Sequence, residues 1–363
     1  MQLFEQLGDE YEQVTVCHDA ATGLRAVVAI HSTALGPALG GTRFYPYLSD
    51  DDALADVLRL ARGMTYKAAA AGLDLGGGKA VILGDPAVDK SEALLRVYGR
   101  FLDGLGGRYI TAEDVGTTQA DMDLIWRETD CVTGVSRSLG GSGDPSAATA
   151  YGLWWAMKAV LHHLDDKTDL AGKHVVVAGV GKVGTALVRH LVEDRAIVTV
   201  TDVNDAAVAR VVRDFDVGAV SVAEAYTVAC DILAPCALGG VLNEHTIPLL
   251  KCRAVAGSAN NQLATPEDGV RLADRGILYA PDFVVNAGGV INIAEELVRY
   301  QRDRAYARVR AIYDTTERVL RAAEAVGTTT VAAAESMARR RMAEVGGLHR
   351  VRTFTPPTAR HRH

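Results

Sequence analysis

The sequence predicts an α/β protein of two domains, an N-terminal α/β domain and a doubly wound Rossmann domain. Its 363 residues exceed the size at which one hydrophobic core usually stops growing. Short apolar runs alternate with helical patterns along most of the chain, which is typical of βαβ units. In the second half, residues 174–203 follow the order strand, glycine turn, helix, strand and acid, which is the order of a dinucleotide-binding unit.

In the first half, apolar patterns and capping residues predict the secondary structure. Helices are expected where apolar residues recur every three or four positions. The three aspartates at 50–52 suit the positive first turn of one helix, and Ser91 can cap another. The expected elements are strands at 14–17 and 24–30 that form a hairpin, a stiff glycine-rich loop at 36–43, helices from 49 to about 67 and from 91 to 105, and strands at 81–83 and 108–112. Asp114 follows the last strand at its carboxyl end, where ligands bind in open α/β sheets.

The glycines and proline at 140–145 mark the best candidate boundary between the domains. A long helix is expected at 146–163, before the dinucleotide unit. Further strands near 231–233, 254–256 and 277–279 alternate with helices and complete a doubly wound sheet, and the chain is expected to be helical from 288–289 to about 344. The polar stretch 355–363 is expected to be disordered.

The glycine turn at 179–184 has the spacing GxGxxG. Gly179 allows the tight turn, Gly181 lets the backbone approach a pyrophosphate at the helix N-terminus, and Gly184 lets the helix lie close to the strand. Asp202 ends the second strand about 20 residues later, where a carboxylate can bind the adenosine ribose hydroxyls. The alternative is an ordinary βαβ unit with a tight turn, but the complete order of elements favours dinucleotide binding.

The composition excludes several classes of protein. A net charge of −7 argues against general binding to nucleic acids or anionic membranes. The sequence shows no secretory signal and no apolar run as long as a membrane span, so we expect a cytoplasmic protein. The five cysteines are odd in number and lack CxxC spacing, so we expect free thiols, and no cluster has the spacing of a metal site.

Two lysines, Lys67 and Lys79, are candidates for chemistry. Lys79 follows three glycines, which can be a simple turn before a surface charge. A phosphate-binding loop is excluded because Leu73 takes the place of its first glycine and Ala80 follows the lysine. Alternatively, the glycines let other groups approach and place Lys79 in a poorly solvated site, where a lysine near another cation can act as a base. Asp114 could then transfer a second proton.

The stretch Leu73–Pro86, with the pattern LxxGGGKxVxxxDP, resembles the signature of the glutamate/leucine/phenylalanine/valine dehydrogenase family. Further similar blocks lie at 36–43, 111–117, 179–184, 234–240, 258–262 and 286–290. The resemblance covers nearly the whole chain and is closest to the valine/leucine dehydrogenases.

The resemblance implies an enzyme that uses NAD for the reversible oxidative deamination of an L-amino acid to a 2-oxo acid and ammonia. It implies that Lys67 binds the substrate α-carboxylate, that Lys79 activates water and that Asp114 transfers protons. Gly41 would contact the substrate through its backbone, and Asn261 would lie near both substrate and nicotinamide. The residues expected at the dinucleotide are Gly179, Val180, Gly181, Lys182, Val183, Gly184, Asp202, Ala234, Pro235, Cys236, Asn260 and Asn261.

The resemblance also implies the substrate side chain. The pocket is expected to consist of four apolar residues, Leu39, Ala112, Val290 and Ile293. Such a pocket favours valine, leucine and isoleucine and rejects glutamate, whose second carboxylate would be buried without a partner.

The resemblance further implies the division of the chain. Residues 1–139 would form the substrate, catalytic and oligomerisation domain, 140–325 the NAD-binding domain, and 326–363 a C-terminal helix that returns toward the first domain. A homo-oligomer between dimer and octamer is expected. Two alternatives remain open, a phenylalanine dehydrogenase of the same family and a catalytically silent NAD-sensing module. A 2-hydroxy acid dehydrogenase is disfavoured, because no catalytic histidine with arginine and aspartate partners follows the dinucleotide unit.

Overall fold

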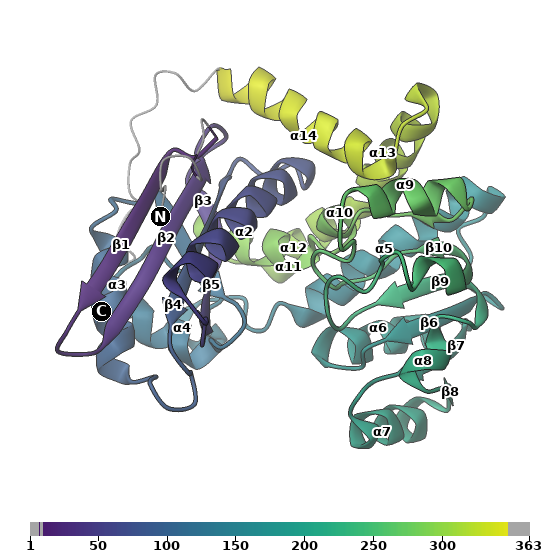
Figure 1. Cartoon of the computed structure of the whole chain (residues 1–363), viewed down its shortest axis with the longest axis horizontal. Coiled ribbons are helices and arrows are strands. Elements are labelled where there is room, and N and C mark those ends of the chain that lie inside the picture. Colours follow the sequence, from purple (N-terminus) through teal and green to yellow (C-terminus); the bar gives the residue numbers. More distant parts are fainter. Residues whose placement is uncertain (1–6, 8–9, 348–363) are drawn as a thin grey trace. The chain divides into compact units, whose positions relative to one another are not determined.

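The computed structural model describes residue 7 and residues 10–347, which form two compact units (Figure 1). The first unit comprises the described residues up to Asp144, together with Ile293–Arg302 and the chain from Ala338. The second unit comprises Pro145–Asn292 and Asp303–Met337. The expected disorder at 355–363 lies outside the described residues. The functional roles expected for 1–139, 140–325 and 326–363 stay predictions.

The first unit is built on a five-stranded sheet with the strand order β1-β2-β4-β3-β5. The strands are β1 Gln13–Asp19, β2 Leu24–Ser32, β3 Ala38–Tyr45, β4 Gly76–Leu83 and β5 Tyr109–Glu113. β1 and β2 pair antiparallel, which confirms the expected hairpin, and β2 also runs antiparallel to β4. β3 lies between β4 and β5 and is parallel to both.

The structure corrects the expectation for the glycine-rich stretch at 36–43. From Ala38 onward this stretch is not a loop but the strand β3, and the glycines from Gly76 likewise belong to strand β4. A Cβ at Gly40 would lie 1.8 Å from the carbonyl oxygen of Gly78. Glycine inside a strand marks such a close approach of another backbone, so the residues that weaken the strand signal are required by the packing of the sheet.

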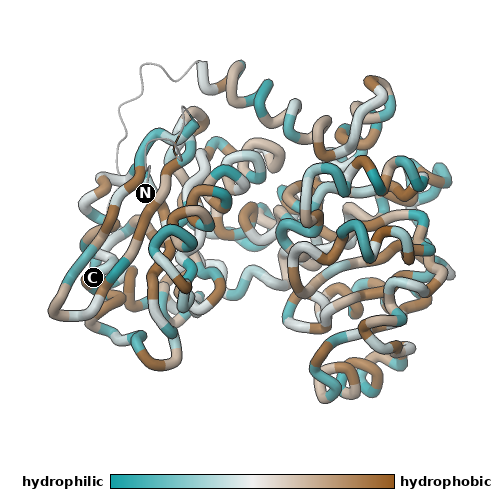
Figure 2. The backbone as a smooth tube through the Cα atoms, viewed as in Figure 1, coloured by the Kyte–Doolittle hydropathy of each residue, from teal (hydrophilic) through white to brown (hydrophobic). Residues whose placement is uncertain are grey.

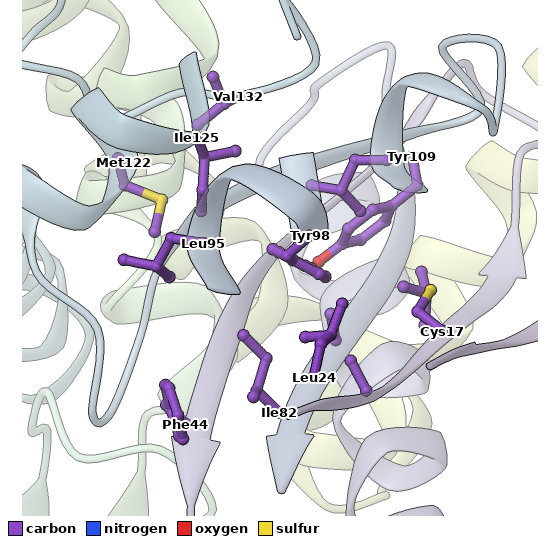
Figure 3. Close-up of a cluster of buried hydrophobic side chains, with 14 of the residues drawn as sticks. Cys17, Leu24, Phe44, Ile82, Leu95, Tyr98, Tyr109, Met122, Ile125 and Val132 are labelled. Carbon is purple, nitrogen blue, oxygen red and sulfur yellow. The ribbon is translucent and has the colours of Figure 1, made fainter. Parts of the chain in front are cut away.

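The two faces of this sheet are covered by different helices. One face packs against α2 Asp50–Ala70, whose buried side chains include Leu54, Val57 and Leu58. Ser49 caps α2 by accepting a hydrogen bond from the backbone of Asp52. The other face packs against α3 Glu92–Asp103 and α4 Gln119–Trp126. Figure 3 shows this second core, which contains Cys17, Leu24, Phe44, Ile82, Leu95, Tyr98, Tyr109, Met122, Ile125 and Val132.

The second unit is built on a six-stranded parallel sheet with the order β11-β10-β9-β6-β7-β8. Its strands are β6 His174–Ala178, β7 Ile197–Thr201, β8 Gly218–Ala219, β9 Ala229–Pro235, β10 Lys251–Val255 and β11 Leu278–Tyr279. The chain starts at β6, builds outward to β8, and then returns to the other side of β6. This is the strand order of a doubly wound Rossmann fold, in which ligands bind where the order reverses. The predicted fold class is confirmed.

Helices α5 Ser146–Asp165 to α14 Thr330–Gly346 follow in the chain. Those between them are α6 Lys182–Glu193, α7 Asp205–Phe215, α8 Val222–Ala225, α9 Glu267–Asp274, α10 Asp282–Val285, α11 Gly288–Ala294, α12 Arg302–Arg310 and α13 Ile312–Val326. The short 3-10 helices are η1 Arg137–Leu139, η2 Ile247–Leu249 and η3 Glu295–Val298. Hydrophobic and hydrophilic stretches alternate along the longer helices (Figure 2), as expected for helices with one buried face. The C-terminal part of α14 belongs to the first unit, where Arg341 pairs with Asp74 at 2.8 Å.

Candidate active site

Several of the predicted site residues share one face of the sheet in the first unit. Gly41 in β3 and Ala112 in β5 are direct partners, and Leu39 is paired with Gly77 of β4. Lys79 precedes Ala80, the partner of Thr42, and is therefore level with Gly41. Because side chains alternate along a strand, Leu39, Gly41, Lys79 and Ala112 all lie on the face that α2 covers.

Lys79 is buried in the middle of β4, with 6% of its surface exposed, and its Nζ forms an ion pair with Oδ2 of Asp114. Asp114 follows the end of β5 directly. Its backbone N–H donates to the Thr117 hydroxyl at 2.9 Å, and that hydroxyl donates to the carbonyl of Thr42 at 2.9 Å. Thr117 therefore ties the backbone of Asp114 to β3. The sequence analysis gave Thr117 no role, although it lies in the similar block at 111–117.

The glycines around the ion pair have defined steric roles. A Cβ at Gly41 would lie 2.9 Å from the Cβ of Asp114, so only glycine leaves room for this carboxylate. A Cβ at Gly77 would lie 2.0 Å from the backbone nitrogen of Thr65 in α2, and a Cβ at Gly78 would lie 2.8 Å from the Tyr109 ring. The glycines before Lys79 therefore let a helix and an aromatic ring approach β4 closely. The expectation of a crowded, poorly solvated lysine is confirmed.

Lys67 lies in the last turn of α2 and is half-buried. It follows Thr65, which packs on Gly77, so the close contact between α2 and β4 also sets the position of the Lys67 backbone. Two of the three predicted catalytic and carboxylate-binding residues are thus joined by a direct contact, and the third lies on the helix that packs against them.

The Asp114 carboxylate is held in its ionised form. Burial on its own would raise the pKa of Asp114, but the positive charges of Lys79 and Arg43 outweigh burial and lower the pKa below its ordinary value. These two cations therefore favour the ionised form of the carboxylate, which is the form that can accept a proton.

The glycine turn of the second unit lies at the carboxyl end of β6. Gly179 has φ of 111°, a conformation that favours glycine, and a Cβ at Gly184 would lie 1.9 Å from the carbonyl oxygen of Gly179. The turn and close-packing roles expected for these two glycines are confirmed. Gly181 is the N-cap of α6 and has no side chain to bond the first-turn N–H groups. A Cβ at Gly181 would meet no described atom within 4 Å, so this helix end fits a pyrophosphate.

Other predicted dinucleotide residues come together at this turn. Oδ2 of Asp202 accepts a hydrogen bond from the backbone of Val180 at 2.8 Å. Ala234 and Pro235 end β9, and the backbone of Cys236 donates to the carbonyl of Ala178 at 2.7 Å. The carboxyl ends of β6, β7 and β9 thus meet at the point where the strand order reverses.

Asn260 and Asn261 lie in a loop of the second unit that Asn286 supports. Nδ2 of Asn286 donates to Oδ1 of Asn260 at 2.9 Å and to the carbonyl of Ser258 at 3.1 Å. Asn261 has φ of 52°, and its carbonyl accepts from the backbone of Gly240 at 2.8 Å. The buried Asn286 was not singled out from the sequence, although it opens the similar block at 286–290.

Val290 and Ile293 lie three residues apart in α11, hence on one side of that helix, and both are buried. Their place in a substrate pocket stays a prediction. Among the described residues no group of three or more histidine, cysteine or acidic side chains could hold a metal ion. The five cysteines are free. No helix in the described part of the chain is long and apolar enough to cross a membrane.

Comparison with known proteins agrees with this architecture. The family profile described as "Glu/Leu/Phe/Val dehydrogenase, dimerisation domain" matches residues 11–131. The profile "Glutamate/Leucine/Phenylalanine/Valine dehydrogenase" matches residues 140–216 and 206–350. The chain is 55% identical over 343 residues to leucine dehydrogenase of Geobacillus stearothermophilus, with 94% of each chain covered. It is 53% identical over 345 residues to valine dehydrogenase of Streptomyces virginiae, with 94% of this chain and 96% of the relative covered.

Among solved structures, L-tryptophan dehydrogenase from Nostoc punctiforme matches with a TM-score of 0.81 and 43% identity, covering 93% of this chain and 97% of that chain. The fold and these matches define an amino-acid dehydrogenase with a Rossmann-type dinucleotide-binding domain. The chain belongs to the glutamate/leucine/phenylalanine/valine dehydrogenase family, as the sequence blocks indicated.

The open space at Gly181 leads to a testable prediction. Gly181→Ala is expected to keep the wild-type Tm, because its Cβ meets no described atom within 4 Å. It is expected to weaken NADH binding about tenfold or more, because the methyl group takes space needed by the pyrophosphate. Fluorescence titration with NADH measures the affinity. As a contrast, Gly184→Ala should lower Tm, since its Cβ would lie 1.9 Å from a carbonyl oxygen. Unchanged NADH affinity in Gly181→Ala would contradict the assignment.

Proposed function

We propose that this protein catalyses the NAD-dependent, reversible oxidative deamination of valine, leucine and isoleucine to the 2-oxo acids and ammonia. The observation that carries the proposal is the buried Lys79–Asp114 ion pair on a sheet face that also presents the apolar side chain of Leu39. The names of the two curated relatives, a leucine and a valine dehydrogenase with 53–55% identity, support the substrate class.

The residues of the first unit divide the work on the substrate. The ammonium of Lys67 binds the α-carboxylate and fixes Cα. NAD, which the glycine turn at 179–184 would hold, would supply the acceptor for the hydride of Cα, so that the substrate becomes an imine. Lys79, once it has lost its proton, takes a proton from the water that attacks the imine carbon. Asp114 accepts a proton from the substrate ammonium before the hydride leaves and returns it to the nitrogen of the carbinolamine that water forms. The hydroxyl proton of the carbinolamine passes to solvent as ammonia leaves and the 2-oxo acid remains.

The ion pair also sets the direction of the pH dependence. A lysine paired with a carboxylate is present as the ammonium, which cannot act as a base. Lys79 must therefore release a proton before it can activate water, and activity should rise toward alkaline pH. Burying a lysine and an aspartate together costs free energy of folding. A silent NAD-sensing module would bear this cost without using the pair, whereas an enzyme uses both groups in catalysis.

Apolar residues on the same face support an aliphatic substrate. Leu39 and Ala112 are almost completely buried and carry no polar group. A glutamate side chain placed against them would lose its hydration without gaining a partner. An aromatic substrate is the second candidate, since a relative with 43% identity is named a tryptophan dehydrogenase. An apolar pocket discriminates by volume only by about 1–3 kcal/mol per methylene-sized misfit.

The choice of NAD over NADP rests on Asp202. Its carboxylate lies at the glycine turn, where it accepts from Val180 at 2.8 Å. An acid at the end of this strand suits the ribose 2′-hydroxyl of NAD and repels the 2′-phosphate of NADP. The residues that follow, Val203, Asn204 and Asp205, supply no arginine for that phosphate.

The proposal predicts a ranking of substrates. The kcat/KM values with NAD should be highest for valine, leucine and isoleucine, about 10–200-fold lower for phenylalanine and tryptophan, and about a thousandfold or more lower for glutamate. NADH absorbance measures each rate, and a parallel series with NADP should be much slower. If an aromatic amino acid or glutamate exceeded all three aliphatic substrates, the substrate assignment would be wrong.

Alanine variants of Lys79 and Lys67 should affect different kinetic constants, kcat for Lys79 and KM for Lys67. Lys79→Ala is expected to lower kcat by a factor of about a hundred or more, the usual contribution of a general base, while NADH still binds. Lys67→Ala should mainly raise KM for the amino acid, because the carboxylate loses its counter-charge. Steady-state kinetics with circular dichroism as the folding control make the test. Near-normal turnover of Lys79→Ala, or a flat pH profile of the wild type from pH 7 to 10, would contradict the roles proposed.

We further propose a homo-oligomer, between dimer and octamer, whose contacts are made by the first unit. The description of the profile that matches residues 11–131 names a dimerisation domain, and β1 is an edge strand of the sheet, which leaves backbone groups open to pairing. Sedimentation velocity at assay concentration should show a species of at least twice the 38.5 kDa chain mass. A monomer would contradict this proposal.

A further inference from the structure

Arg43 in β3 lies between two carboxylates. Its Nε is 3.4 Å from Oδ2 of Asp114, and its Nη1 is 2.8 Å from Oδ2 of Asp56. The side chains of Arg43, Asp114 and Asp56 are 22%, 17% and 15% exposed, so water screens these charges only in part. Lys79 pairs with the same oxygen of Asp114. Oδ2 of Asp114 therefore has two cations beside it, Lys79 and Arg43. Of these two, only Lys79 has a role in the mechanism proposed above.

Asp56 in α2 fixes the guanidinium from the other side. Its Oδ2 accepts from Arg43 Nη1 at 2.8 Å and from the Tyr47 hydroxyl at 2.7 Å, and its Oδ1 accepts from Arg59 at 2.7 Å. This anchoring directs Nε of Arg43 toward Asp114. Nε has no hydrogen-bond partner within residues 10–347. A movement of about half an ångström would turn its contact with Asp114 into a charge-assisted hydrogen bond.

Arg43 differs from Lys79 in that its charge does not change. Burial alone would lower the pKa of Arg43, but the carboxylates of Asp114 and Asp56 outweigh burial and raise the pKa. In the proposed mechanism Lys79 must be neutral before it acts as a base, and it becomes an ammonium when it takes a proton from water. Without a second cation, Asp114 beside the neutral amine would be a poorly solvated carboxylate, and burial would favour its protonated form.

The titratable and charged groups around Arg43 and Asp114 come from several elements of the first unit. They are Lys79 on β4, Arg43 on β3, Tyr47 after β3, Tyr109 on β5 and Asp56 on α2, with Arg59 on the far side of Asp56. Burial raises the pKa of Tyr47 and of Tyr109, so both phenols stay neutral in the assay range. Of the two cations that act on Asp114 in the described part of the chain, Lys79 and Arg43, the guanidinium of Arg43 is the one that keeps its charge.

We infer that Arg43 is a positioning residue of this enzyme: its guanidinium, anchored by Asp56, keeps the Asp114 carboxylate ionised and turned toward Lys79 while the lysine exchanges its proton with solvent and with the attacking water. This inference rests on the roles proposed above for Lys79 and Asp114. Arg43 contacts neither substrate nor cofactor in this account and acts only through Asp114.

The pH profile of kcat/KM tests the inference. In Arg43→Gln the alkaline rise should move to higher pH by about one unit, because loss of a positive charge makes it harder to remove a proton from the pair. At a fixed pH on the rising limb this is about a tenfold loss. Arg43→Lys keeps the charge and should keep the position of the profile, with a lower kcat. The matched control Arg59→Gln removes the exposed partner of Asp56 and should leave both profile and rate unchanged. A folded Arg43→Gln with the wild-type profile would overturn the inference.

A thermal double-mutant cycle separates this inference from the proposed function, because it needs no turnover. Asp114→Asn should shift Tm differently in the wild type and in Arg43→Gln, with a non-additivity of about 2–4 °C. Non-additivity in a protein whose Lys79→Ala variant is fully active would refute the proposed chemistry and retain the Arg43–Asp114 coupling. Additive Tm shifts with an unmoved profile would refute the coupling and retain the chemistry. If Arg43→Gln does not fold, Arg43→Met, which keeps an unbranched stem, decides by the same two measurements.

Discussion

The buried ion pair of Lys79 and Asp114 is the constraint on which the first unit depends. Moving two charges out of water costs several kcal/mol each, and their attraction compensates only if the geometry is tight. The surrounding backbone is adapted to this need. Gly41 leaves room for the Asp114 side chain, and Gly77 allows α2 to pack closely on β4. The Thr117 hydroxyl holds the turn after β5 by a hydrogen bond to the carbonyl of Thr42. The glycines that weaken the strand signal are therefore a consequence of placing charge inside a sheet.

In the second unit the backbone, and not a buried pair of charged side chains, forms the candidate binding site for an anion. Its parallel strands end at one edge of the sheet, and the order reverses between β6 and β9. The glycine turn, Asp202 and the end of β9 gather there through main-chain hydrogen bonds. Few side chains are needed, because the N-terminus of α6 supplies the partial positive charge.

The sequence predicted the elements whose signals are local and missed those that depend on distant residues. The helices that begin after Ser49 and Ser91 were predicted because their first-turn residues and apolar spacing lie within one segment. The sequence predicted a loop where strand β3 lies, because the close approaches that require its glycines come from Gly78 of β4 and from Glu113 and Asp114. The partners of Arg43 are 13 and 71 positions away along the chain, on a helix and a turn, so no pattern within β3 could reveal them. Family resemblance supplied the roles of Lys67, Lys79 and Asp114 that spacing alone left open.

The two faces of the sheet in the first unit carry residues with different functions, and this bears on how substrate preference can change in evolution. Alternation along the strands places Leu39 and Ala112 on the same face as Lys79, while Phe44, Tyr98 and Tyr109 belong to the core on the opposite face. The residues that we propose shape substrate choice are thus on the opposite face of the sheet from residues of this core. Selection can remodel the first set with little penalty to the second, so one scaffold can acquire new preferences through a few changes on a single side.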